Sequence, residues 1–210
     1  MVMGIKLDKG THKMNIDFKN IDQTDIYKLM SHSIIPRPIA WIVTEHDGIV
    51  NIAPFSYFTG LSSNPPTMIV SIGHKADGSQ KDTLKNIREN GVCTICIASP
   101  DELDKLHLSS KSLDFNESEA EIYEIKTQKV YDNFPPMIED IQTAYFCTLY
   151  QEVELKGSKT IPLIVEIKHM YISDKIVSNA EKFHFQVDPI ARVGKSYNII
   201  GDELEPPTIL

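Results

Sequence analysis

The chain has 210 residues, of which 41% are hydrophobic and 24% are charged, and its formal net charge is −8 at pH 7. This acidic balance argues against binding to nucleic acid or to an anionic membrane, because both functions favour a basic face. No apolar run reaches the length that spans a bilayer, and the polar N-terminus lacks a signal-peptide pattern. We expect an N-terminal arm over residues 1–20 and a single domain over residues 21–210.

The first predicted element is a short helix over residues 22–30, where the side chain of Asp22 is suited to cap the first turn. Pro36 and Pro38 follow this helix. Because the residue before a proline avoids helical geometry, this segment should be extended and should lead into the first strand.

Two strand patterns then flank a tight turn. Residues 39–44 and 49–53 are rich in β-forming residues, and Asp47-Gly48 between them is typical of two-residue hairpins. We therefore expect an antiparallel hairpin. Pro54 has no N–H to donate to a neighbouring strand, so regular pairing of the second strand should stop there.

The loop after this proline is a candidate ligand site. If the ladder ends at Pro54, the backbone N–H groups of residues 55–58 are free to donate, beside one hydroxyl and several aromatic rings. Such a loop suits a heteroaromatic ring with carbonyl edges. The alternative is a strand end that Phe55 and Phe58 anchor in the core, and composition alone leaves both interpretations open.

The next segment predicts a phosphate site. A strand over residues 67–73 leads into a polar loop, after which Asp82 or Thr83 can cap a helix that runs to about Asn90. Lys81 precedes this helix, and a helix N-terminus with free N–H groups, a hydroxyl and a lysine can bind phosphate. The Asp82 carboxylate should turn back to the cap. The alternative is an ordinary capped surface helix.

The three cysteines are predicted to be structural. Cys93 and Cys96 form a Cys-x-x-Cys pair within a buried-strand pattern, in which residues three apart point to opposite faces. Cys147 lies in an apolar run and is expected in the core. An odd number of cysteines without a secretion signal indicates a reducing compartment, so we expect a cytoplasmic protein. The histidines show no metal-binding spacing, and no metal site is expected.

The remaining elements favour a barrel. A short helix at residues 100–108 precedes an acidic, serine-rich stretch at 109–124, which predicts a solvated excursion. Residues 144–155 and 161–172 predict a long hairpin across residues 156–159. With several strands, helices between them and no regular βαβ repeat, the sequence favours a mainly β fold, a mostly antiparallel β-barrel with peripheral helices.

A set of ordered motifs links these elements. They are Pro-Arg-Pro-Ile-Ala-Trp at 36–41, Asp-Gly at 47–48, Asn-Ile-Ala-Pro-Phe-Ser-Tyr-Phe at 51–58, Asn-Pro-Pro at 64–66, Val-Ser-Ile at 70–72 and Lys-Asp-Thr-x-x-Asn at 81–86. Together they resemble the flavin reductase-like family of FMN-binding split barrels, which includes flavoredoxin and the reductase components of two-component monooxygenases. A weaker match extends to residues 189–194 and Tyr197.

The resemblance implies an FMN-binding split β-barrel that forms a homodimer with its site near the interface. It implies hydride transfer from NADH or NADPH to flavin, with reduced flavin or electrons passing to a partner oxygenase or redox protein. Because hydride transfer is the cofactor's own chemistry, no acid or base residue is required. The residues that it assigns to the cofactor or nicotinamide are Trp41, Asn51, Ala53, Pro54, Phe55, Ser56, Tyr57, Phe58, Ser71, Lys81, Thr83, Asn86, Arg192 and Tyr197.

Within this set, residues 51–58 are expected to meet the isoalloxazine and the ribityl chain. Arg192 and Tyr197 are expected on the cofactor or nicotinamide side. The residues expected at the phosphate are Lys81 and Thr83, with Ser71 or Asn86.

Two alternatives stay open at this point. One is a flavoredoxin-like electron carrier, in which FMN is fixed and the partner is another redox protein. The other is a non-catalytic FMN-binding or structural barrel. The turn at residues 156–159 lacks the Gly-Asp-His-like turn of many family members, which leaves the contacts to the nicotinamide open.

Overall fold

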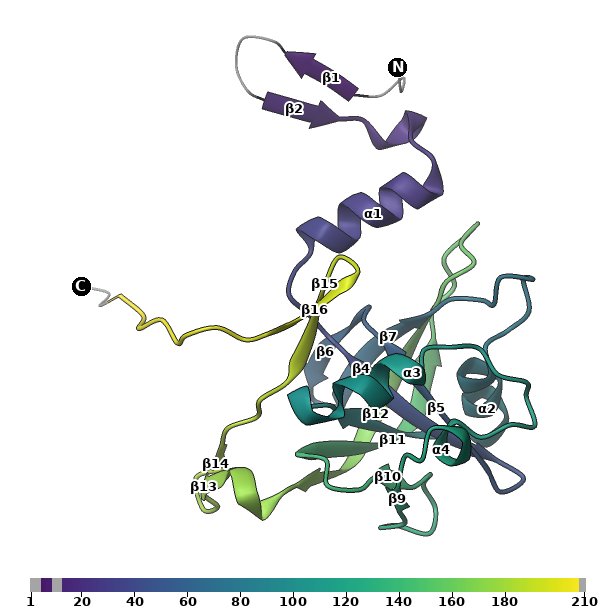
Figure 1. Cartoon of the computed structure of the whole chain (residues 1–210), viewed down its shortest axis with the longest axis vertical. Coiled ribbons are helices and arrows are strands. Elements are labelled where there is room, and N and C mark those ends of the chain that lie inside the picture. Colours follow the sequence, from purple (N-terminus) through teal and green to yellow (C-terminus); the bar gives the residue numbers. More distant parts are fainter. Residues whose placement is uncertain (1–4, 9–12, 208–210) are drawn as a thin grey trace.

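The computed structural model describes residues 5–8 and 13–207, and its body is a curved sheet of seven strands (Figure 1). The strand order is β5-β4-β8-β11-β12-β7-β6, and every neighbouring pair is antiparallel. This confirms the predicted mainly β, mostly antiparallel class. The strands are β4 (Ala40–His46), β5 (Ile49–Phe55), β6 (Phe58–Ser63), β7 (Pro66–Ile72), β8 (Val92–Ile97), β11 (Thr143–Glu152) and β12 (Ile161–Ile172).

The predicted hairpin is β4–β5. Asp47 and Gly48 both have positive φ, 49° and 81°, as a two-residue turn of this kind requires. The expectation that pairing stops at Pro54 was wrong, because Pro54 pairs with Trp41 and the ladder continues to Phe55. Since β5 is an edge strand, the nitrogen of Pro54 can face away from β4, where the missing N–H breaks no ladder bond.

The sheet has a packed core on each face. Alternation along β4 places Ile42 in one core and Trp41 in the other. Cys93 and Cys96 likewise point to opposite faces of β8, and Cys147 packs in the core with Cys93. All three cysteines are free and buried, as predicted.

Helix α2 (Asp82–Asn90) packs Leu84 and Ile87 into the core that contains Ile42. It ends at Gly91, whose φ of 72° suits glycine at a helix C-terminus. The predicted caps, Asp82 and Thr83, were wrong. Lys81 is the N-cap residue and makes no side-chain hydrogen bond to the helix, so the first N–H groups have no side-chain acceptor.

The stretch from 109 to 124 is mostly exposed, as its composition predicts, but Ser109, Ser118 and Glu119 are buried. It follows α3 (Leu103–Leu108) and returns along the free edge of β5, where α4 (Glu119–Ile122) lies. Ser118 Oγ donates to the Val50 carbonyl at 2.7 Å, and Glu119 Oε2 accepts from the Ile52 N–H at 3.0 Å. These two side chains satisfy backbone groups on the free edge of the sheet.

A second, three-stranded sheet joins the C-terminal part of the chain to the segment just before β4. It consists of β3 (Arg37–Pro38), β15 (Ile190–Val193) and β16 (Ser196–Ile199), in the order β16-β15-β3. The turn between β15 and β16 reaches the end of α1 (Gln23–Ser33), as Figure 1 shows. Arg37 is buried and donates to the carbonyls of Ser31 and Gly194, so its guanidinium ties α1 to this turn.

The helix predicted from Asp22 is confirmed, and the Asp22 side chain accepts from the N–H groups of Thr24 and Asp25. The predicted arm over residues 1–20 lies partly outside the described residues; within it, β1 (Ile5–Asp8) pairs with β2 (Lys13–Ile16). None of the helices in the described ranges is long and apolar enough to cross a membrane. The remaining short elements are η1 (Phe18–Asn20), β9 (Thr127–Gln128), β10 (Met137–Ile138), η2 (Pro100–Glu102), η3 (Asp174–Ile176), β13 (Val177–Asn179) and β14 (His184–Phe185).

Candidate functional site

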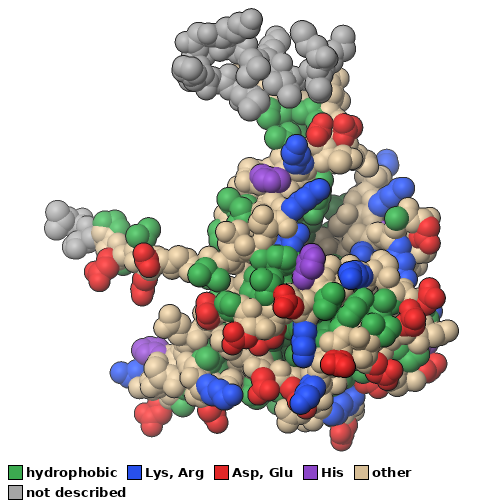
Figure 2. Space-filling model, in the orientation of Figure 1, with side chains coloured by type: hydrophobic (Ala, Val, Ile, Leu, Met, Phe, Trp, Pro, Cys, Tyr) green, Lys and Arg blue, Asp and Glu red, His purple; other side chains and the backbone are tan. Residues whose placement is uncertain are grey.

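Acidic and basic side chains are interspersed over the face in Figure 2, so an anionic ligand would depend on a local cluster of positive charge. Such a cluster lines a cavity of about 120 Å³, partly open to solvent, which we call the α2 cavity. Four segments line it: β5, the segment after β7, the start of α2, and the stretch from residue 109 to Glu119. The lining residues from β5 and α2, with the residue before it, are Asn51, Ala53, Pro54, Phe55, Lys81, Asp82 and Thr83.

A smaller cavity adjoins it, and Pro54 and Ser110 line both. We call it the hairpin cavity, because Arg192 and Tyr197 come from the β15–β16 hairpin. The predicted cofactor residues that the two cavities bring together are Asn51, Ala53, Pro54, Phe55, Ser56, Lys81, Thr83, Arg192 and Tyr197.

The start of α2 offers donors to the α2 cavity. Lys81 is half-buried there, and the helix N-terminus behind it carries no side-chain cap. Uncapped N–H groups and the positive end of the helix dipole attract anions. A buried hydroxyl, Thr83, stands in the first turn.

A buried network orients this hydroxyl. The Asn51 side-chain amide donates to Thr83 Oγ1 at 3.0 Å and to Thr44 Oγ1 at 3.1 Å. The Asn86 amide also donates to Thr44 Oγ1, at 3.1 Å. Because Thr83 Oγ1 already accepts from Asn51, its own O–H remains available as a donor to the cavity. Asn86 thus supports the site from behind and lines neither cavity.

The charges in the α2 cavity are partly paired. Lys75 forms an ion pair with Asp82, with 2.9 Å between Nζ and Oδ1. The Asp82 carboxylate therefore turns to Lys75 and not to the helix cap, which corrects the prediction. Lys81 and Lys111 line the same cavity from two other segments. An anion that enters the cavity would therefore meet the positive charges of Lys81 and Lys111.

Glu119 adds an acid that the sequence reasoning missed. Its side chain is 4% exposed, and it lines the α2 cavity from the start of α4. Burial is the main cause that raises the pKa of Glu119, and the Ile52 N–H and Lys75 oppose it. The nearby Asp82 raises this pKa further.

The hairpin cavity has a stacked cation. The Arg192 guanidinium lies over the Tyr197 ring, 4.3 Å from its centroid. The Tyr197 hydroxyl lies 3.1 Å from His107 Nδ1 on α3. These contacts hold the hairpin against α3, and they leave a planar aromatic and cationic surface beside Pro54 and Ser56.

Trp41 lies outside both cavities. It is fully buried in the core, and its indole N–H donates to Ser109 Oγ at 2.9 Å. Since Ser109 lines the α2 cavity, Trp41 supports the wall of that cavity from the core side. This differs from the predicted direct contact with a cofactor.

Three other predicted residues also line neither cavity. Phe58 and Ser71 belong to paired strands, β6 and β7, and Tyr57 packs its ring 5.9 Å from the ring of Tyr27 on α1. Because the ladder runs through Phe55 and resumes at Phe58, only Ser56 and Tyr57 lie between the strands. The predicted loop of free amides is therefore shorter than expected.

The comparison with known sequences decides the family. The pattern described as the flavin reductase like domain matches residues 30–186. The chain belongs to this family. This flavin reductase-like protein is also 30% identical to YwrF of Bacillus subtilis, over 85% of this chain and 91% of YwrF.

Solved structures agree with this flavin reductase-like assignment. Component B of nitrilotriacetate monooxygenase from Bacillus cereus has a TM-score of 0.83 and 27% identity, covering 92% of this chain and 98% of that chain. The nitroreductase NbaA of Pseudomonas fluorescens has a TM-score of 0.82 and 26% identity, covering 93% and 98%. A protein of Shewanella frigidimarina with a split barrel domain has a TM-score of 0.76 and 22% identity, covering 90% and 94%. The fold is thus a split β-barrel.

The donor set of this flavin reductase-like protein fits a flavin phosphate. The uncapped α2 N-terminus, the Thr83 hydroxyl and Lys81 can all donate to phosphate oxygens. The α2 cavity runs from these donors along β5 to Pro54, which also lines the hairpin cavity, so a ligand held at α2 by its phosphate would have its other end near the hairpin cavity.

Proposed function

We propose that this protein binds FMN and passes hydride from NADH or NADPH to it, supplying reduced flavin or electrons to a partner. The observation that carries the proposal is the uncapped start of α2, where Lys81 and Thr83 line the same cavity as β5. The family assignment supports an oxidoreductase that acts on flavin. We also propose that the protein is located in the cytoplasm.

The chain would hold the phosphate of FMN at α2. Lys81 supplies a charged donor, Thr83 a hydroxyl that Asn51 orients, and the helix its first N–H groups. The ribityl chain and isoalloxazine would then follow β5 past Ala53 and Phe55. When bound, FMN supplies the hydride-accepting chemistry.

The hairpin cavity would receive the nicotinamide side. Arg192 and Tyr197 form a stacked pair at its wall, and Ser56 adds a hydroxyl. Planar rings stack on such surfaces, and an arginine can also pair with a nucleotide phosphate. Binding there would place the nicotinamide beside the ring end of the flavin, which orients the two rings for hydride transfer.

We also propose a homodimer. Apolar side chains on α1, on the segment after it and on β6 are exposed, with exposed fractions of 51% for Tyr27, 54% for Ile34 and 52% for Leu61. Exposed apolar patches of this kind mark interaction surfaces. Because Tyr27 contacts Tyr57, beside Ser56 of the hairpin cavity, this surface lies close to the site.

The partner would be an oxygenase or a redox protein. The similarity to component B of a monooxygenase supports an oxygenase, since that protein is named as a component of a monooxygenase. An electron carrier with fixed FMN is the second candidate, because Lys81 and Thr83 would hold a phosphate whichever partner receives the electrons.

Steady-state oxidation of NADH and NADPH, with and without added free FMN, tests this function. We expect rapid oxidation that depends on flavin. Reduction of tightly bound FMN in a single event without turnover would favour the carrier. If neither nucleotide reduces FMN and no turnover occurs, the proposed reductase activity is wrong and a binding barrel is left.

A further inference from the structure

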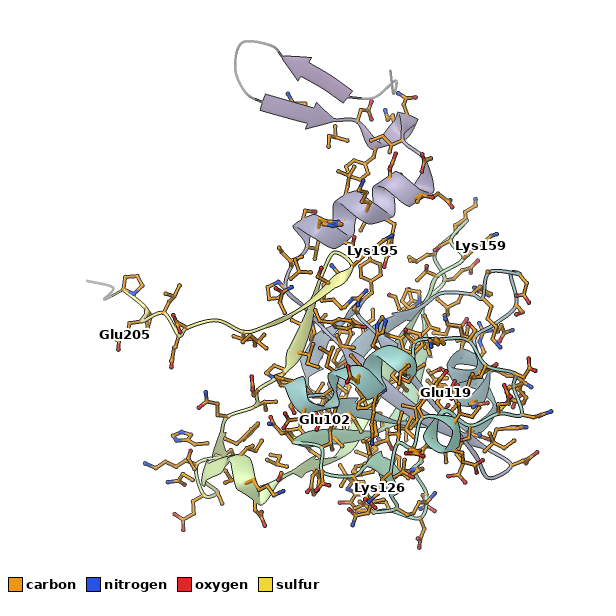
Figure 3. All side chains as sticks on the ribbon, in the orientation of Figure 1. Glu102, Glu119, Lys126, Lys159, Lys195 and Glu205 are labelled. Atoms are coloured by element: carbon orange, nitrogen blue, oxygen red, sulfur yellow. The ribbon has the colours of Figure 1, made fainter. Side chains whose placement is uncertain are left out.

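Glu119 has no role in the flavin chemistry described so far, although it lines the α2 cavity with Lys81 and Thr83. Figure 3 labels it at the start of α4, which packs along β5. One carboxylate oxygen, Oε2, accepts from the Ile52 N–H at 3.0 Å. The side chain is 4% exposed, so its charge state depends on the groups that face it.

These groups come from each element around the cavity. The segment after β7 brings Lys75, α2 and the residue before it bring Asp82 and Lys81, and the loop after α3 brings Lys111. The facing strand, β5, contributes the Ile52 N–H and no titratable group. Burial and Asp82 raise the pKa of Glu119 above its ordinary value of 4.5, while Lys75 lowers it.

We propose that Glu119 takes up a proton from solvent when the phosphate of FMN enters the α2 cavity. This inference rests on the proposed function, because it places the phosphate at α2. A phosphate monoester carries a charge of about −1.5 to −2 near pH 7. A buried carboxylate and a phosphate in one cavity repel each other, and protonation of the carboxylate removes that repulsion.

The consequence is a pH-dependent affinity. Linkage requires that FMN binding weakens as the pH rises from the pKa of Glu119 in the free protein to its higher pKa in the complex. Riboflavin has no phosphate, so its binding should not cause Glu119 to take up a proton. Glu119 would therefore set how strongly the site prefers FMN over riboflavin, with the greatest preference at the lower pH.

The test compares FMN binding to wild type, Glu119→Gln and Glu121→Gln by flavin fluorescence from about pH 6 to about pH 9. Glutamine keeps an acceptor for the Ile52 N–H, so the fold should survive. The control, Glu121→Gln, removes one negative charge from an exposed position two residues further along α4. The FMN phosphate, whose second pKa is about 6, ionises in the same way in all three experiments, so its own titration does not cause a difference between the proteins.

We expect Glu119→Gln to bind FMN about tenfold more tightly than wild type at the high end of this range, since one pKa unit of coupling equals a tenfold change. The ratio of the two affinities should fall towards the low end of the range, and Glu121→Gln should follow wild type. For riboflavin, the affinities of wild type and Glu119→Gln should stay in a constant ratio across the pH range.

A second measurement uses wild type directly. Calorimetric titration with FMN in two buffers of different ionisation heat should show more proton uptake by wild type than by Glu119→Gln. Equal proton uptake and equal pH profiles would overturn the role of Glu119 while leaving FMN binding in place. If no variant bound FMN at any pH, the proposed function and this inference would both be wrong.

Discussion

Glu119 and Thr83 show how a single neighbour determines what a polar side chain can do in the α2 cavity. Thr83 can donate to a ligand because Asn51 already donates to its oxygen. The backbone N–H groups of Ile52 and of Glu119 itself stabilise the charged form of the Glu119 carboxylate, while burial favours the neutral form. Burial is the larger effect, so the acid keeps its proton to a higher pH than an exposed glutamate.

This balance predicts a pH-dependent stability difference between wild type and Glu119→Gln. The folded pKa of Glu119 is raised, so the stability that its proton confers is complete below 4.5 and is lost as the pH rises through the raised pKa. The glutamine in Glu119→Gln does not titrate, so this variant loses no stability from position 119 over that pH range. The free energy of unfolding of Glu119→Gln minus that of wild type should therefore increase with pH.

Urea denaturation of both proteins at a series of pH values measures this difference. Glu121→Gln, at an exposed position, provides the baseline for the removal of one negative charge. A difference that stays constant with pH would show that burial does not shift the titration of Glu119.

Residue patterns predicted this site unevenly. Lys81 and Thr83 were placed at a helix start because Asp82 or Thr83 was expected to cap it; the helix begins there, although Lys81 is its N-cap residue. Glu119 was missed because the acidic, serine-rich stretch around it is typical of solvent-exposed chain. Only the free edge of β5, which needs partners for the Val50 carbonyl and the Ile52 N–H, explains why Ser118 and Glu119 are buried. The need for these hydrogen-bond partners arises only from the tertiary structure.

At the scale of elements, the β15–β16 hairpin is positioned by α1. The Gly194 N–H donates to the Ser31 carbonyl at 2.9 Å, and the Gly194 carbonyl accepts from Arg37 at 3.3 Å. Gly194 has a φ of 56°, and a Cβ added to it would lie 2.3 Å from His32 Nε2. The hairpin that carries Arg192 thus depends on a glycine in its turn.

Gly194→Ala should therefore affect both stability and the nicotinamide side. The left-handed backbone costs an alanine roughly 1–2 kcal/mol, and to relieve the contact with the added Cβ either the exposed His32 ring turns aside or the hairpin shifts away from α1, and we expect the hairpin to shift. We expect a higher KM for NADH because Arg192 moves with the hairpin. Gly157→Ala is the matched control: its φ is 80° and nothing lies within 4 Å of its added Cβ.

Thermal melts and steady-state kinetics of the two variants separate these effects. Both should lose stability, and only Gly194→Ala should raise the KM. An unchanged KM in Gly194→Ala, at a similar loss of stability, would mean that the hairpin does not position the nicotinamide.

Element prediction worked where local chemistry dominates. The β4–β5 hairpin follows from Asp47-Gly48, and helix α1 follows from Asp22. It failed at Pro54, because whether a proline ends a ladder depends on whether its strand is an edge strand. That property belongs to the whole sheet and cannot be determined from the residues beside the proline.

At the scale of the whole molecule, the apolar surface on α1 and β6 predicts self-association. A double variant, Ile34→Glu with Leu61→Glu, should dissociate the proposed homodimer, because buried unpaired charges oppose an apolar interface. The control is Ile122→Glu, an exposed apolar residue on α4 with an exposed fraction of 49%. Figure 1 shows α4 at the opposite end of the barrel from α1.

Sedimentation velocity at several protein concentrations gives the oligomeric state. Wild type and Ile122→Glu should sediment as dimers and the double variant as a monomer. A monomeric wild type over the whole concentration range would contradict the proposed dimer.

The central claim is that the α2 cavity binds FMN through its phosphate, and Lys81→Ala tests it most directly. A hydrogen bond to a charged group is worth about 1.5–3 kcal/mol, which corresponds to roughly a ten- to hundredfold loss of FMN affinity. We expect that loss in a titration that follows the emission of Trp41, with riboflavin affinity and melting temperature nearly unchanged. Equal FMN affinity in wild type and Lys81→Ala would contradict the account.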